Sequence, residues 1–218
     1  MTNWFVLPGM GASSSMYNSL KQELNFDVHF LNWPKYKNEV SYKDIAGRII
    51  TENNICDADV IGGSSLGGMI ALEISTIVNT KAVILMGSAI RWNEINKLLS
   101  MLSPLSPVTP ISLIQALSGK NEHIVSQMFA DSDPDFIRAM CKYISSWPGY
   151  RGAIDKVYRI HGQKDHIITC PKSDCEVVKD AGHLLAITHA RECATFIEKV
   201  GSHLTHFCTG GIGSDLNY

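Results

Sequence analysis

The distribution of hydrophobic residues along the chain predicts alternating strands and helices. Short apolar runs recur six times, and such runs are typical of strands that are buried on both faces of a sheet. They occupy Trp4 to Leu7, Val28 to Leu31, Asp59 to Ile61, Ala82 to Met86, Val157 to Ile160 and Cys175 to Val178. Helical patterns lie between them. We therefore expect an α/β fold with a mostly parallel sheet of about six strands flanked by helices.

The helices are indicated by apolar stripes and by N-cap residues. Ser13 to Ser15 offer N-caps for a first helix, and Ser41 to Asp44 resembles a capping box for a second one. The closing helix carries apolar residues at i, i+3, i+4 and i+7. These residues are Cys193, Phe196, Ile197 and Val200.

The alternation is interrupted between the fourth and fifth predicted strands, where roughly 65 residues replace a short crossover. Prolines divide this stretch, and helical patterns cover Asn93 to Leu102, Ile111 to Leu117 and Asp135 to Ile144. We expect residues 1–88 and 156–208 to form the core, 89–155 a helical cap, and 209–218 a flexible tail. The apolar residues of the cap either pack it onto the body or line an acyl pocket.

Composition narrows the choice of partner and location. The chain has 218 residues, 45% of them hydrophobic, and a formal net charge of −2, which gives no reason to expect nucleic acid or a membrane as partner. No signal peptide or membrane span is visible near the start, so a cytoplasmic location is expected. The six cysteines are scattered, and we expect reduced thiols.

One segment carries a specific chemical signal. The apolar run ending at Ile61 leads into Gly63-Ser64-Ser65-Leu66-Gly67 and then into residues with helical spacing. A strand, a Gly-x-Ser-x-Gly turn and a helix in this order are typical of a nucleophile elbow. Flanking glycines let the turn be tight enough to hold a serine hydroxyl above the sheet. Ser65 is therefore the candidate nucleophile.

A serine hydroxyl needs a base, and the base needs a carboxylate that orients it. Asp165 follows the fifth predicted strand, and His183 follows the sixth. The order Ser, Asp, His is the one expected after such an elbow. A structural loop carboxylate is the alternative for Asp165. His203, His206 and Cys208 have a spacing that a metal could use, but the signal is weak, and we expect neither a metal nor a cofactor.

Together these motifs resemble the α/β-hydrolase family, in particular carboxylesterase-like members with an inserted cap. The segments that carry the resemblance start at Leu7, Gly63, His161 and Ala181. It implies that Ser65 is the nucleophile, that His183 is the general base and then the acid, and that Asp165 orients His183.

The resemblance also implies an oxyanion hole formed by the backbone N–H groups of Met10 and Leu66. The chain departs from many relatives at Pro8-Gly9, where they have His-Gly. A supporting hydrogen bond from that histidine is therefore missing, which puts the support of the oxyanion loop in doubt.

The expected function is hydrolysis of a small acyl ester through an acyl-enzyme. The same chemistry leaves open a thioesterase, or an esterase for acyl groups on an acyl carrier protein, similar to pimeloyl methyl esterases. The basic residues of the predicted cap are not obviously clustered, so they do not favour a carrier. A ligand-binding protein on the hydrolase fold is a further alternative.

Overall fold

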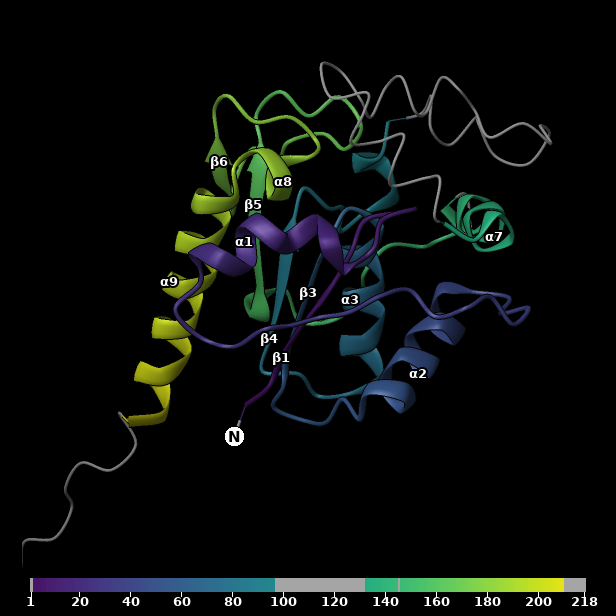
Figure 1. Ribbon diagram of the computed structural model, residues 1–218, viewed down its shortest axis with the longest axis horizontal. Helices are drawn as coiled ribbons and strands as arrows, with labels where there is room; N and C mark the ends of the chain where they lie inside the picture. Colours follow the sequence, from purple (N-terminus) through teal and green to yellow (C-terminus); the bar gives the residue numbers. More distant parts are fainter. Residues whose placement is uncertain (1, 97–131, 145, 210–218) are drawn as a thin grey trace, which may run out of the picture.

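The computed structural model describes residues 2–96, 132–144 and 146–209 (Figure 1). In this part of the chain, six strands form one parallel sheet in the order β2-β1-β3-β4-β5-β6. The strands are β1 (Trp4–Leu7), β2 (His29–Phe30), β3 (Val60–Ser64), β4 (Ala82–Met86), β5 (Val157–Gly162) and β6 (Glu176–Val178). The predicted six-stranded sheet is confirmed.

Helices cover both faces of the sheet (Figure 1). One face carries α2 (Tyr42–Asn53) and α3 (Leu66–Ile77), and α7 (Pro134–Ile144) packs against the same core. The other face carries α1 (Asn18–Glu23), α8 (Leu185–Thr188) and α9 (Ala190–Thr209). The described residues also form short 3-10 helices, which are η1 (Ser14–Tyr17), η2 (Trp92–Glu94) and η3 (Ile154–Lys156).

Alternation along the strands divides the core into two clusters. In β1, Phe5 and Leu7 join the cluster under α2 and α3, whereas Trp4 and Val6 join the cluster under α1 and α9. Successive side chains of a strand point to opposite faces, so a sheet covered on both sides needs apolar residues at every position. This explains why the inner strands β1 and β4 appear in the sequence as unbroken apolar runs.

Two of the expected caps are present. The Ser13 hydroxyl accepts a hydrogen bond from the N–H of Ser15 at the start of η1, and the Ser41 hydroxyl accepts one from the N–H of Asp44 at the start of α2. The prediction of a helix from Asn93 to Leu102 is wrong for its first residues. Residues 92–94 form η2 instead, and Ile95 pairs with Ile168 as an isolated antiparallel bridge.

The described ends of the long stretch after β4 lie against the body. Ile95 pairs with Ile168 in the loop after β5, and the N–H of Tyr150 donates to the carbonyl of Ile90 at 2.8 Å. The helix predicted from Asp135 is observed as α7. The helix predicted over residues 111–117 lies outside the described residues, as does the predicted tail from 210 on. The division into core and cap stays a prediction.

Glycines allow β1, β3 and α3 to approach one another closely. A Cβ atom placed on Gly67 would lie 2.4 Å from the carbonyl oxygens of both Leu7 and Pro8, and one on Gly63 would lie 2.3 Å from the carbonyl carbon of Gly67. These distances are far shorter than any van der Waals contact with a Cβ. The start of α3 can therefore reach the end of β1 only with glycine at position 67, and it can pack against β3 only with glycine at position 63.

We expect Gly67→Ala to destabilise the fold by about 1 to 3 kcal/mol, because the backbone of the β1 end or of α3 must move. The free energy of unfolding in urea measures this effect. Gly47→Ala is the matched control, since no atom lies within 4 Å of its added Cβ. Gly47 is inside α2, so the control should stabilise the protein by about 0.5 to 1 kcal/mol. Equal effects of the two variants would contradict the close approach.

Candidate active site

Ser65 occupies the turn between β3 and α3 in a strained conformation. Its φ is 51° and its ψ is −119°, values that side-chain-bearing residues rarely adopt. Two hydrogen bonds hold this backbone in place. The N–H of Ser65 donates to the carbonyl of Met86 at 3.2 Å, and the Ser88 hydroxyl donates to the carbonyl of Ser65 at 2.7 Å. The end of β4 and the segment that follows it thus fix the predicted elbow.

Asp165 lies in the loop after β5, with no exposed side-chain surface. Its Oδ1 accepts hydrogen bonds from the N–H groups of Ile167 at 2.8 Å and Ile168 at 3.0 Å. The turn that brings the carboxylate here is closed by the N–H of Asp165, which donates to the carbonyl of Gly162. The loop therefore fixes one oxygen of the carboxylate and leaves the other for side chains.

His183 connects the other two predicted residues. It lies in the loop after β6, and this loop is joined to the Asp165 loop by a bond from the Lys164 N–H to the Ala181 carbonyl. Its Nδ1 is 2.8 Å from Oδ2 of Asp165, and its Nε2 is 2.9 Å from Oγ of Ser65. The structure thus brings together three residues that are up to 118 positions apart in the chain.

The charge state of Asp165 determines the direction of these bonds. Burial alone would raise the pKa of this carboxyl. The charge of His183, hydrogen bonds from His161 and His183, and the Ile168 N–H outweigh burial and lower the pKa of Asp165 well below its usual range. The ionised carboxylate can only accept, so Nδ1 of His183 carries the proton. Nε2 is then free to accept the proton of the Ser65 hydroxyl.

The predicted oxyanion loop lies beside the elbow. It forms a tight turn in which the Ala12 N–H donates to the Gly9 carbonyl at 3.1 Å, and Gly11 has a φ of 72°. A Cβ on Gly9 would be 3.9 Å from Cβ of Ser65. Leu66 is the first residue of α3, where N–H groups have no partner inside the helix. The N–H groups of Met10 and Leu66 stay predicted donors to an oxyanion.

Two aromatic residues that the sequence did not single out support this loop. The Trp33 indole N–H donates to the Gly9 carbonyl at 2.9 Å. The buried Tyr17 hydroxyl donates to the Leu7 carbonyl at 2.7 Å and accepts from the N–H of Ser64 at 3.1 Å. These contacts tie the oxyanion loop and the elbow to each other. No motif marks either residue in the sequence.

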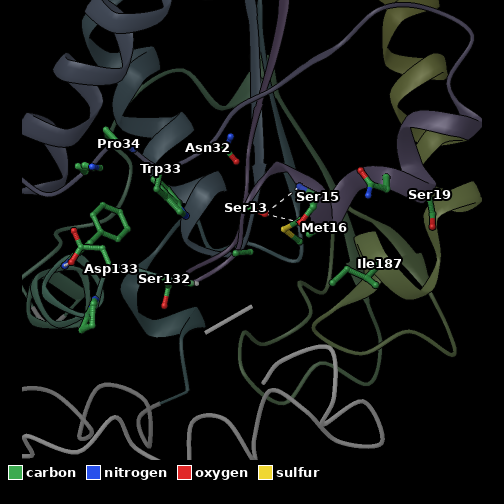
Figure 2. Close-up of a pocket in the computed structure, with 16 residues that line it drawn as sticks. Ser13, Ser15, Met16, Ser19, Asn32, Trp33, Pro34, Ser132, Asp133 and Ile187 are labelled. Atoms are coloured by element: carbon green, nitrogen blue, oxygen red, sulfur yellow. Dashed lines mark hydrogen bonds between the residues drawn. The ribbon is translucent and has the colours of Figure 1, made fainter. Parts of the chain in front are cut away.

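A cleft of about 850 Å³ opens beside the same loop. Gly11 and Ala12 form part of its wall. Figure 2 shows Trp33 and Asp133 on one side of the cleft and Ile187 of α8 on the other. The ring centroids of Trp33 and of Phe136 in α7 lie 5.1 Å apart, and the two ring planes are tilted relative to each other. The cleft has a volume suited to a small molecule, with aromatic and aliphatic residues among polar ones.

The part of the chain with assigned positions contains no group of three or more His, Cys, Asp or Glu side chains that could hold a metal ion. The weak C-terminal candidate includes His206 and Cys208, whose side chains lie outside the described residues. Among the helices that the structure describes, none has the length and apolar character needed to cross a membrane. The five described cysteines are free thiols.

The sequence matches the alpha/beta hydrolase family over residues 5–196, a range that includes Ser65, Asp165 and His183. The chain belongs to this family. No curated protein sequence is significantly similar to it.

Solved structures of several hydrolytic enzymes have the same fold. An esterase from Thermogutta terrifontis is 15% identical, with a TM-score of 0.69 over 94% of this chain and 90% of that chain. A putative lipase from Acinetobacter baumannii is 13% identical, with a TM-score of 0.69 over 94% and 85%. The N-acyl homoserine lactonase AidH is 14% identical, with a TM-score of 0.70 over 94% and 92%. At these identities the similarity establishes the fold alone.

The lowered pKa of Asp165 predicts a pH-dependent stability. Because the pKa in the folded state lies below the ordinary value of 3.8, this group stabilises the fold above about pH 4, and the contribution is lost as the pH falls further. We expect Asp165→Asn to lower the free energy of unfolding by about 1 to 3 kcal/mol at neutral pH. Urea titrations should show that the difference in free energy of unfolding between the variant and the wild type becomes smaller below about pH 4. A gap that stays constant down to pH 3 would contradict the lowered pKa.

Proposed function

We propose that the protein is a serine hydrolase that cleaves carboxylic esters through an acyl-enzyme. One observation carries the proposal, namely the continuous hydrogen-bonded line from Ser65 through His183 to the buried carboxylate of Asp165, with distances of 2.9 and 2.8 Å. The strained backbone of Ser65 adds support, because it presents the hydroxyl at the end of β3 and not inside the sheet.

In the first half of the reaction, Oγ of Ser65 attacks the ester carbonyl carbon while Nε2 of His183 takes the hydroxyl proton. The carbonyl oxygen becomes an oxyanion, for which the N–H groups of Met10 and Leu66 are the proposed donors. The ester C–O bond then breaks, and His183 gives its proton to the departing alkoxide. An alcohol leaves, and the acyl group stays on Ser65.

In the second half, water takes the place of the alcohol. The water attacks the acyl carbon while His183 removes one of its protons. The N–H groups of Met10 and Leu66 are again the proposed donors to the oxyanion that forms. Collapse of this intermediate breaks the bond to Ser65, whose oxygen recovers the proton from His183. The carboxylic acid leaves. Asp165 stays ionised throughout and stabilises the positive charge that His183 carries in each half.

We assign the cleft between Trp33 and Ile187 to the acyl chain of the substrate. Gly11 and Ala12, which follow Met10 in the proposed oxyanion loop, line this cleft, whereas Ser65 and His183 are not among its lining residues. The acyl group is also the part of the substrate that stays on Ser65 through both halves of the reaction. Cleavage of an ester, a lactone or a thioester would use the same residues, and the structural neighbours include esterases and a lactonase.

Hydrolysis of a p-nitrophenyl ester series from acetate to laurate tests the proposal, with an acyl thioester and an N-acyl homoserine lactone in parallel. We expect turnover of at least one ester, and a loss on the order of 10⁴-fold or more in kcat in Ser65→Ala. Ser202→Ala, on the exposed face of α9, is the control and should keep full activity. Turnover that survives Ser65→Ala would refute the proposal, and a marked preference for the thioester would favour a thioesterase.

Narrowing the cleft should change the preferred acyl length. We expect Ile187→Trp to lower kcat/KM for long acyl chains about tenfold relative to acetate, because the larger side chain fills space that a long chain needs. Ile187→Val is the matched control and should leave the ratio within about twofold. Measuring esters of one acid with different alcohols checks the assignment. A change that follows the alcohol and not the acyl chain would contradict it.

A further inference from the structure

A second histidine contacts the carboxylate that orients His183. His161 is in β5, four residues before Asp165, and its side chain is 1% exposed. Its Nε2 lies 3.0 Å from Oδ2 of Asp165 and 2.9 Å from the carbonyl oxygen of Ile168. Nε2 makes its hydrogen bond to the Ile168 carbonyl, and Oδ2 of Asp165 lies within ion-pair distance of both imidazole rings. The ester mechanism proposed above gives His161 no part.

The neighbours of His161 determine where its proton lies. Both atoms near Nε2 are acceptors, because Asp165 is ionised and a carbonyl oxygen cannot donate. Nε2 must therefore carry a proton. Nδ1 is buried and has no hydrogen-bond partner among the described residues, so a second proton there would place an unpaired N–H and a positive charge in the core. His161 is held as a neutral donor.

His161 also closes the loop that carries Asp165. The N–H of Ile168 donates to Oδ1 of Asp165, and the carbonyl of the same residue faces Nε2 of His161. One ring thus contacts both the carboxylate and the backbone that holds it. Rotation of the carboxylate away from His183 would break contacts at both oxygens, since Oδ1 is held by two N–H groups.

We infer that His161 is a positioning residue that aims Oδ2 of Asp165 at Nδ1 of His183 and shares the negative charge of that carboxylate. The inference rests on the proposed function, because it assigns a role within the line of residues proposed there. His161 touches no substrate in this role and acts through Asp165. Among the described residues, His183 and Cys170 also interact with this carboxylate, and Arg159 in turn interacts with Cys170.

Two substitutions separate positioning from simple filling of space. His161→Leu fills the site without a donor, whereas His161→Gln offers an amide with two N–H groups for the same two acceptors. We expect His161→Leu to lower kcat about tenfold or more with KM within about twofold, and His161→Gln to recover most of the loss. Equal kcat values for the Leu variant and the wild type, or equal losses in both variants, would overturn the inference.

The pH profile gives a readout that a purely structural role would not move. Without the His161 donor, the Asp165 carboxylate becomes a stronger acceptor and His183 keeps its proton to a higher pH. The acid limb of kcat/KM should therefore shift to higher pH in His161→Leu and return in His161→Gln. An acid limb at the wild-type position in the Leu variant would overturn the role in charge sharing.

NMR of the wild-type protein with ¹⁵N-labelled histidine tests the inference even if the Leu variant fails to fold. We expect His161 to show a protonated Nε2 and a bare Nδ1. A proton on Nδ1 alone, or on both nitrogens, would overturn the inference. Failure of the proposed function is distinguishable, because turnover would then survive Ser65→Ala whatever the state of His161.

Discussion

The candidate site depends on the close approach between the end of β1 and the start of α3. Gly67 lies against the carbonyl oxygens of Leu7 and Pro8 with no room for a side chain. This contact sets the distance between the loop that begins at Pro8 and the turn that carries Ser65. Parallel strands all end at the same edge of the sheet, so the loops after β5 and β6 reach the same place. The Ser65, Asp165 and His183 side chains meet at that edge.

Much of this arrangement could be predicted from the sequence, because the signals are local. The inner strands β1, β3 and β4 are buried at every position and so appear as apolar runs. The elbow is a five-residue pattern whose glycines have a steric cause. The places of Asp165 and His183 follow from which strands precede them. These inferences need only the chain order and the geometry of a parallel sheet.

The supporting residues could not be predicted, because their partners are distant in the chain. Trp33 bonds to Gly9, 24 positions away, and Tyr17 bonds to Ser64, 47 positions away. His161 is closer to Asp165 in the chain, but its place within an apolar strand indicates a core residue and not a donor to a carboxylate. The error at Asn93 has a similar origin. Its helical pattern is overridden where Ile95 pairs with Ile168, a contact that local propensity does not contain.

The bond between Tyr150 and Ile90 brings together two points that are 60 positions apart on either side of the long stretch after β4. The body therefore supplies fixed attachment points, and the entropy of closing a chain between such points rises only slowly with its length. A change of length between Ile90 and Tyr150 therefore costs little closure entropy. What such a change must preserve is set instead by the described side chains of this stretch that contact the body, namely Ile95, which pairs with Ile168, and Phe136 and Met140, which belong to the core.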